Sequence, residues 1–496
     1  MLVKLVNRLV ENTLSNKNSI YVFALPLLVL QIYALSNGSY TLSHVDEAIF
    51  SSGSQSFAQT GKAITNYCIQ ENVSVIGQYN WYGPFWNILY GIGFMVLSSN
   101  LVFILINILF AWLSIYLISN YLSNYGNLVA VLILLCYPWL YYQFSFFPET
   151  VFFFVSVVNL VFLFRLIRSA NKNTSLLLFA LLIFIEIPIR VTSVFWLFGL
   201  IPFLNRKNFV WLSGLIFSGV FTGFLYLKYL CAPAFVSGLK SFTSTNTNNF
   251  MHLIAAMFEG LYKNIIIIIV EHHPGVLLLL FMISLCTYVC LKHRSKLLIA
   301  ITLISWISVG TMLMLYSTIS FFFVKLSMFL YPLLIFGIVS ANEEYTYKKW
   351  LLVLFTLLSP IVFYKTFGNI QKHKQISNNE SLVFYNSLPK IADLETKESI
   401  LTILFNAPDF EKYLQSSQYL PFVNKNGKNI RYTSNITPAN AKLEIKYKLH
   451  GKLPVSYVIL KNAEVDKLEL KKPVLKLYGF QLFDIKDTPF KISVEN

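Results

Sequence analysis

The sequence predicts a mainly α-helical, polytopic membrane protein with about eleven transmembrane helices, interfacial helices in the first outer loop, and a small C-terminal α+β domain. The 496 residues are 56% hydrophobic and only 12% charged, whereas about a quarter of the residues of a soluble protein are charged. The apolar residues also fall in runs of roughly twenty, the length of a helix that crosses a bilayer core of ~30 Å.

Basic residues set the expected orientation. Lys4, Arg8 and Lys17 precede the first apolar run, about Ile20 to Leu35. Lys and Arg are enriched in cytoplasmic segments, so the amino terminus is expected inside the cell and the following loop outside it. The polar stretch Met1 to Lys17 and the lack of a small-residue cleavage site argue against a cleavable signal peptide.

The first outer loop spans residues 36–100. Its latter part, 83–97, is apolar but short, and it starts at Gly83-Pro84. We expect this part to lie in the membrane interface, because counting it as a span would invert every later loop.

The distribution of charge supports this assignment. The predicted cytoplasmic segments hold 13 Lys and Arg against three acidic residues, and the outer segments up to residue 366 hold seven of each. This asymmetry is typical of a membrane protein with its amino terminus inside. The eleven predicted spans are 20–35, 101–119, 127–145, 150–164, 174–187, 191–204, 209–230, 275–291, 297–315, 326–341 and 350–366.

The composition changes after the last span, which divides the chain into residues 1–366 and 367–496. Residues 370–496 hold 19 Lys and Arg and 13 acidic residues. Leu443 to Leu449 alternate as strands do, and Asp409 to Leu414 can open a helix. We expect a small α+β domain on the extracytoplasmic face. The net charge of +16 follows from topology and this domain, and no nucleic-acid partner is expected.

The five cysteines show no CxxC pair and no metal-ligand spacing. Cys286 and Cys290 lie one helical turn apart in an apolar run, which is typical of small core residues. Cys68 and Cys231 both fall in predicted outer loops, and a disulfide between them stays open.

Acidic residues are rare in the first half of the chain, and two of them are adjacent. Asp46 and Glu47 follow the first span and open a long outer loop that can fold over them. Glu149 appears two spans later, in Pro148-Glu149, where Pro148 ends one helix and Glu149 begins the next. Capping alone explains Glu149, but a shared face with Asp46 would make a site. We name Asp46, Glu47 and Glu149 as candidate catalytic residues.

Basic residues at the outer ends of the predicted spans could bind the negatively charged part of a substrate. Arg190 lies at the outer ends of two predicted spans, and its planar guanidinium suits a phosphate. Lys325 follows an aromatic run, where snorkelling to lipid head groups is the alternative reading. His273 follows His272, and adjacent helical histidines point apart, so we consider one of them as a phosphate or sugar contact. Arg190, Lys325 and His273 are the candidate phosphate-binding residues. Arg190 is also expected to pair with Glu186, four residues earlier.

His44, Trp81 and Tyr82 are candidate residues for binding a sugar or an acceptor. His44 lies two residues before Asp46, and Asn80-Trp81-Tyr82 has the aromatic character of a saccharide platform. The same residues are typical of the start of any interfacial helix.

The order of these features resembles the GT-C superfamily of membrane glycosyltransferases, and especially its protein-mannosyltransferase and aminoarabinose-transferase branch. An Asp-Glu pair after the first span and an acid after two further spans match that branch. Arg190-Val191-Thr192-Ser193 keeps two residues of an Arg-Pro-Thr-Gly-like segment. Lys325 to Pro332 resembles a late basic-Tyr-Leu-Pro-Pro-like segment, with Lys for the usual Arg. The resemblance covers about residues 20–345.

The resemblance implies a reaction. The donor would be a polyprenyl-phosphate sugar, and the sugar would move to a hydroxyl of a glycan, lipid or protein with inversion at the anomeric carbon. Asp46 would be the general base, Arg190 and Lys325 would stabilise the departing lipid phosphate, and Glu149 would position the acceptor or a divalent metal. No clear ligand set occurs, so metal dependence stays open.

Two other classes remain open. A transporter or flippase of a lipid-linked saccharide predicts charges at span midplanes and broken helices in matched halves, which the sequence does not show. An O-antigen polymerase or ligase would put its key basic residues in a large late outer loop, whereas here the largest loop is early and acidic. The abundance of Lys, Asn, Ile and Phe favours a bacterial inner membrane.

Overall fold

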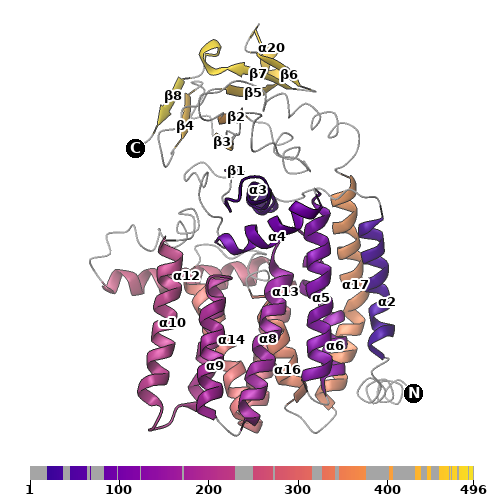
Figure 1. Cartoon of the computed structure of the whole chain (residues 1–496), viewed down its shortest axis with the longest axis vertical. Helices are drawn as coiled ribbons and strands as arrows, with labels where there is room; N and C mark the ends of the chain where they lie inside the picture. The colour runs from indigo at the N-terminus through magenta and orange to yellow at the C-terminus, as the bar shows by residue number, and fades with distance from the viewer. Residues whose placement is uncertain are drawn as a thin grey trace.

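The protein is an upright bundle of helices with a β-sheet domain above one end, as the computed structural model shows (Figure 1). The two ends of the bundle differ, and we call the end nearest the sheet the outer end. The structure describes residues 19–36, 45–63, 67–68, 83–97, 99–122, 125–169, 172–229, 250–271, 274–315, 327–340, 346–375, 401–405, 431–436, 444–447, 457–467, 470, 472–477, 480–489 and 491–494.

Helices cover all eleven predicted spans, and six are long and apolar enough to cross a membrane. The protein is therefore an integral membrane protein, while the count of eleven crossings stays a prediction. The bundle is formed by α2 (Ser19–Leu35), α5 (Leu101–Tyr121), α6 (Gly126–Leu134), α7 (Tyr137–Tyr142), α8 (Glu149–Arg168), α9 (Lys172–Glu186), η2 (Val191–Phe203), α10 (Phe209–Tyr229), α13 (Pro274–His293), α14 (Lys296–Leu315), α16 (Leu330–Ser340) and α17 (Thr346–Gln375).

Three predicted spans differ in form from a regular α-helix of the expected length. The span 127–145 is broken into α6 and α7, because Pro138 near the start of α7 has no N–H to bond the preceding turn. The span 191–204 is the 3₁₀-helix η2 of 13 residues, and its rise of about 2.0 Å per residue lets so short a segment reach about 26 Å. The last helix, α17, continues past residue 366 to Gln375.

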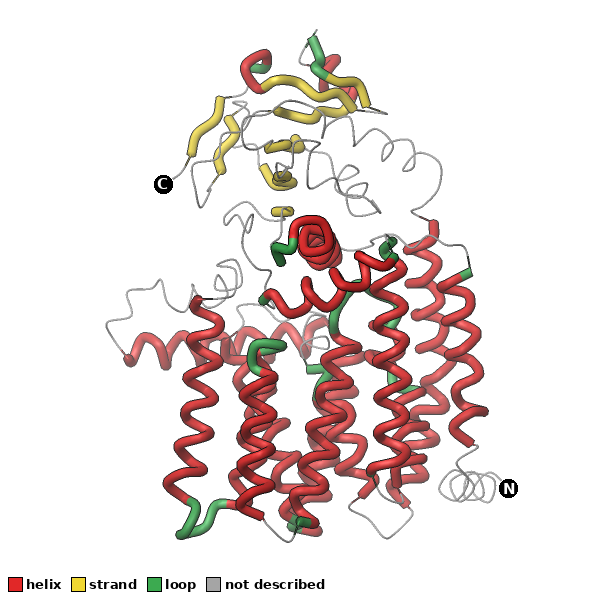
Figure 2. The backbone as a smooth tube through the Cα atoms, viewed as in Figure 1, coloured by secondary structure: helices red, strands yellow, loops and turns green. Residues whose placement is uncertain are grey.

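Two helices of the first outer loop lie across the outer end. Helix α3 (Val45–Thr60) rests on α4 (Pro84–Val96), and α4 runs across the top of the bundle rather than along it (Figure 2). The apolar segment 83–97 therefore does not add a span. Helix α12 (Phe250–Glu271) also lies flat against the bundle at this end (Figure 1).

The C-terminal domain contains a six-stranded sheet in the order β1-β3-β2-β5-β7-β6. Strands β1, β3, β2 and β5 are parallel, and β7 pairs antiparallel with β5 and β6. A separate parallel pair joins β4 to β8. The strands are β1 (Tyr67–Cys68), β2 (Leu401–Phe405), β3 (Arg431–Ile436), β4 (Glu444–Tyr447), β5 (Tyr457–Lys461), β6 (Leu475–Leu477), β7 (Phe480–Asp484) and β8 (Lys491–Val494), with a short helix α20 (Asn462–Lys467).

The edge strand β1 comes from the first outer loop. Tyr67 and Cys68 pair with Tyr432 and Thr433 of β3. This strand was not predicted, because its two residues carry no periodic pattern. The pairing ties the loop that follows α3 to the C-terminal domain. The helix considered at Asp409 to Leu414, and Cys231 of the suggested disulfide, lie outside the described residues.

Basic residues occur in the helix ends and turns at the end of the bundle opposite the sheet, which we call the basic end. This end also receives the start of α2, so the chain enters the bundle there. The gathering agrees with the predicted sidedness, and the assignment of this end to the cytoplasm stays a prediction. The described basic residues there include Arg165, Arg168, Arg206, Lys207, Lys292, Arg294, Lys296 and Lys348.

Candidate functional site

The outer turn, residues 143–148, joins α7 to α8 and is buried along its whole length. Its backbone groups are bonded by side chains from elements far apart in the sequence. Asn107 of α5 donates to the Ser145 carbonyl oxygen at 2.9 Å, and Asn369 of α17 donates to the Phe144 carbonyl oxygen at 3.2 Å. A buried turn without such partners would leave polar groups unsatisfied. The outer turn is therefore the point at which the outer end is held together.

Glu47 joins the first outer loop to this turn. It lies in the first turn of α3, where a helix N-terminus favours negative charge, and it is 1% exposed. Its Oε1 accepts a hydrogen bond from the Phe146 N–H at 3.1 Å. His373 Nε2 of α17 lies 3.8 Å from the same oxygen. The carboxylate is thus fixed between the outer turn and the end of the last membrane helix.

Asp46 precedes Glu47 in the first turn of α3. Its backbone is described and its side chain lies outside the described part of the structure. Since Glu47 is anchored to Phe146, the backbone of Asp46 is held above the outer turn as well.

Glu149 begins α8 directly after the outer turn, as predicted, and Pro148 is the N-cap residue. The preceding helix, α7, already ends at Tyr142, so the prediction that Pro148 ends that helix is wrong. Arg190 Nη1 donates to Glu149 Oε1 at 3.0 Å, and the two side chains are 1% and 0% exposed. The Arg190 guanidinium also lies over the Phe152 ring, 4.4 Å from its centroid. Two residues predicted from separate stretches therefore form a buried ion pair, in which both the carboxylate and the ring orient the guanidinium.

Arg190 was also expected to pair with Glu186, and this is wrong. Helix α9 ends at Glu186, and Arg190 has the extended backbone conformation φ −158, ψ 122. The four-residue spacing therefore no longer brings the two side chains together. Glu186 instead accepts a hydrogen bond from Asn159 Nδ2 of α8 at 2.6 Å.

Buried hydroxyl groups accompany the ion pair in the sequence. Thr150 follows Glu149, and Thr192 and Ser193 follow Arg190. In the described part of the structure, none of these three hydroxyls has a hydrogen-bond partner. A buried hydroxyl is costly to leave unbonded, so these groups are candidates to contact a ligand.

Tyr90 of α4 extends the polar cluster to the interfacial helices. Its hydroxyl donates to Asn107 Oδ1 at 2.7 Å. Burial, and then the negative charge of Glu149, raise the pKa of Tyr90 well above its ordinary value. The hydroxyl therefore stays protonated and remains a donor throughout the physiological pH range. Asn107 in turn bonds the outer turn, so α4, α5 and the start of α8 form one network.

Helices α3 and α4 approach closely because glycines lie where they cross. A Cβ built on Gly91 would lie 2.8 Å from the backbone oxygen of Ser54 in α3, and one on Gly53 would meet the side chain of Asn87. Gly83, at the N-cap of α4, has φ +80 and faces the Tyr226 hydroxyl of α10. Only glycine fits these positions without displacing a neighbour.

The structure leaves part of the predicted site untested. His44, Trp81, Tyr82, His273 and Lys325 lie outside the described residues. Of the nine candidates, Glu47, Glu149 and Arg190 have described side chains, and all three are buried at the outer end.

The described residues contain no group of three or more His, Cys, Asp or Glu side chains that could hold a metal ion. Glu149 is directed at Arg190, and Glu47 at a backbone N–H and His373.

Three residues of the network were missed by sequence reasoning. His373 falls beyond the expected end of the last span, in the polar run Gln371-Lys372-His373-Lys374. Asn107 is a polar amide inside an apolar helix, which is a recognisable signal in a membrane protein. Tyr90 gave no signal, because tyrosine is common in interfacial helices.

Comparison with known proteins gives results at the level of structure alone. No family model matches the chain, and no curated protein matches it. The oligosaccharyltransferase of Archaeoglobus fulgidus, solved with zinc and sulfate, matches with a TM-score of 0.50 and 13% identity over 89% of this chain and 67% of that chain. Its apo form matches with a TM-score of 0.50 and 14% identity over 89% of this chain and 69% of that chain.

ArnT from Cupriavidus metallidurans, solved with undecaprenyl phosphate, has a TM-score of 0.49 and 11% identity, over 94% of this chain and 98% of that chain. At these identities, the likeness to the archaeal enzyme is one of fold.

Proposed function

Because the chain has the fold of the GT-C superfamily, we propose that it is a membrane glycosyltransferase. It would move a sugar from a polyprenyl-phosphate donor to an acceptor hydroxyl at the outer end. One observation carries this proposal. The acids that open the first outer loop and the acid that opens α8 lie on either side of the outer turn, since Glu47 bonds Phe146 and Glu149 follows Pro148. Arg190 adds a cation to the same cluster.

We assign the general base to Asp46. Its carboxylate takes the proton of the acceptor hydroxyl while the acceptor oxygen bonds to the anomeric carbon. The bond from that carbon to the phosphate oxygen breaks, and the leaving polyprenyl phosphate keeps the electron pair. Attack from the face opposite the phosphate inverts the anomeric centre.

Glu47 acts in this scheme by positioning Asp46. Its carboxylate is buried and already engaged with the Phe146 N–H and His373, so it is poorly placed to take a proton from an acceptor. Holding Glu47 fixes the first turn of α3, and with it the backbone of Asp46. Catalytic groups require such fixed placement, because small displacements cost large factors in rate.

Arg190 and Lys325 stabilise the negative charge that develops on the leaving phosphate. Glu149 and the Phe152 ring hold the Arg190 guanidinium in one orientation, as a preorganised phosphate contact requires. The hydroxyls of Thr192 and Ser193 are further candidate donors to phosphate oxygens. His273 joins the donor site, and Glu149 also positions the acceptor.

His44, Trp81 and Tyr82 of the first outer loop are proposed to contact the sugar or acceptor. The loop is bonded to the outer end by Glu47 in α3, and at the start of α4 Gly83 lies close to Tyr226 of α10. An aromatic platform in such a loop suits a saccharide, which stacks on ring faces.

Asp46→Asn tests the proposal. We expect turnover to fall by about 10²–10⁴-fold while the affinity for a polyprenyl-phosphate sugar is retained, since an amide keeps the size of the carboxylate and cannot accept the proton. Transfer would be measured with the purified protein in detergent, and donor binding by calorimetry. Glu71→Gln, which changes an acid of the same loop that has no assigned role, is the matched control.

Unchanged transfer by Asp46→Asn would refute the catalytic assignment. Vesicles in which the wild-type protein moves a lipid-linked saccharide across the bilayer without transferring it would favour the transporter instead.

A further inference from the structure

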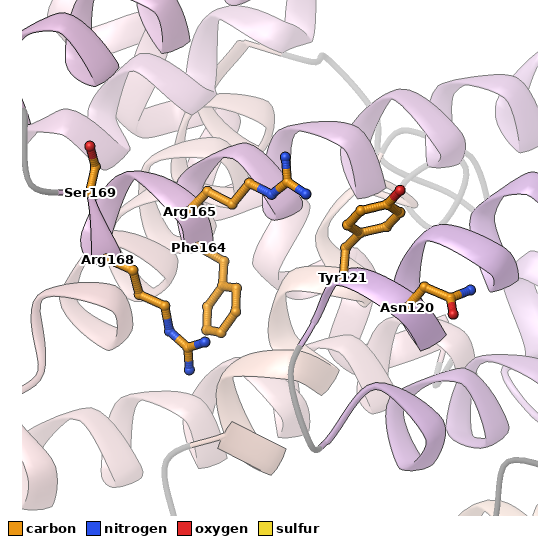
Figure 3. A pocket seen from close by; sticks show the side chains of 6 residues that line it. All are labelled: Asn120, Tyr121, Phe164, Arg165, Arg168 and Ser169. Atoms are coloured by element: carbon orange, nitrogen blue, oxygen red, sulfur yellow. The ribbon is translucent and has the colours of Figure 1, made fainter.

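A pocket of about 400 Å³ lies at the basic end, at the opposite end of α8 from Glu149. The end of α5 and the end of α8 form its walls (Figure 3). A helix of 20 residues is about 30 Å long, so this pocket is on the other side of the membrane from the proposed site. Its lining residues are Asn120, Tyr121, Phe164, Arg165, Arg168 and Ser169.

Two guanidinium groups dominate the pocket. Arg165 lies over the Tyr121 ring at 4.9 Å from its centroid, and Arg168 over the Phe164 ring at 4.1 Å. Figure 3 shows both guanidinium groups directed toward these rings. Stacking on a ring holds the plane of a guanidinium and leaves its N–H edge for a ligand. Within the described part of the chain, neither arginine has a carboxylate partner.

An exposed apolar stripe leads along α5 toward this pocket. Leu105, Leu109, Leu113 and Tyr116 are all exposed, and their spacing of four, four and three residues puts them on one face of the helix. The stripe ends one turn before Asn120 and Tyr121. A molecule with an anionic head in the pocket and an acyl chain along the stripe would satisfy both features, whereas a soluble anion would use only the pocket.

We propose that this pocket binds the phosphate group of an anionic phospholipid in the membrane leaflet at the basic end. Basic pockets between transmembrane helices commonly bind lipid head groups. Membrane orientation requires only positive charge, which any Lys or Arg near the ends of the spans would supply. The stacking of two guanidinium groups on two rings is specific to arginine, because a lysine ammonium is a point charge without a planar face.

Lipid binding to the full-length protein tests the proposal. Native mass spectrometry would measure the binding of dioleoylphosphatidylglycerol, with dioleoylphosphatidylcholine as the neutral comparison. We expect Arg165→Ala with Arg168→Ala to weaken binding of the anionic lipid by about thirtyfold. Arg165→Lys with Arg168→Lys, which keeps the charge, is expected to recover only part of the affinity.

Arg206→Ala with Lys207→Ala is the matched control, because it removes the same charge from another loop at the basic end. An equal loss in this control, or no loss in the arginine double variant, would overturn the proposal. If the lysine double variant bound the anionic lipid as tightly as the wild type, stacking would have no role and the proposed pocket would be wrong. The last measurement is competition of the bound lipid with excess inorganic phosphate. Displacement of the lipid together with direct phosphate binding to lipid-free protein would assign the pocket to a soluble anion instead.

Discussion

Charged side chains are buried and paired at one end of helix α8 and exposed at the other. At the outer end, Glu149 and Arg190 are buried and bonded to each other, and Glu47 is bonded to the outer turn. At the basic end, Arg165 and Arg168 are exposed and rest on aromatic rings. Burying a charge is costly unless it is paired. The stability of the outer end therefore depends on keeping these buried charges in one arrangement. Arg165 and Arg168 are exposed, so they can contact a ligand at little cost.

The largest effect should come from removing one member of the buried pair. Arg190→Met leaves Glu149 without its cation, and we expect the free energy of unfolding to fall by about 3–5 kcal/mol. Arg165→Met at the basic end should change it by no more than about 0.5 kcal/mol. Reversible unfolding in detergent would measure both. Similar losses for the two variants would remove the contrast between the ends of α8.

Glu47 separates the contribution of a hydrogen bond from that of charge. Glu47→Leu removes the acceptor of the buried Phe146 N–H, and we expect a loss of about 1–3 kcal/mol. Glu47→Gln keeps an acceptor oxygen and should lose less stability. If Glu47 positions Asp46, both variants lower the turnover number more than they raise the Michaelis constant. A Leu variant as stable as the wild type would mean that the outer turn does not depend on α3.

Replacing glycine by alanine should change stability in opposite directions at the crossing of α3 and α4 and at an uncrowded position of α10. Gly91→Ala puts a Cβ 2.8 Å from a backbone oxygen of α3, and such overpacking costs about 1–3 kcal/mol. A Cβ on Gly214 in α10 would meet nothing within 4 Å, so Gly214→Ala should be neutral or stabilising by up to about 1 kcal/mol. Thermal midpoints in one detergent would compare them. A stabilised Gly91→Ala variant would show that the two helices are not in close contact.

Tyr90 gives the smallest effect. Tyr90→Phe loses the hydrogen bond to Asn107, which should cost about 1 kcal/mol. The folded protein raises the pKa of Tyr90, so its contribution is fully present below the unfolded value of about 10. It is lost as pH rises above that value, because the unfolded state then releases the proton more readily. Stability measured against pH should therefore fall less steeply above about pH 10 in the Phe variant. Parallel curves would contradict this origin of the shift.

The sequence predicted the membrane fold well because each span carries its own signal. Apolar length defines a span within one segment, and the Pro148-Glu149 boundary is likewise local. The pairing of Arg190 with Glu149 was not predicted, because the sequence offered the nearer Glu186 and the end of α9 is hard to locate. His373 and β1 were missed for the same reason. Their partners, Glu47 and Thr433, lie hundreds of residues away, and no local pattern encodes such contacts.

Strand β1 has a consequence for the order in which the protein is made. Residues 67–68 leave the ribosome early, yet their partners at 432–433 are synthesised only after every membrane helix has been made. Long-range pairings of this kind form late in folding. His373 lies in the last turn of α17 and can contact Glu47 only once the last membrane helix has been made, so the outer end is completed late in biosynthesis. A nascent chain stalled before residue 373 would hold a nearly full set of membrane helices and still lack part of its outer network.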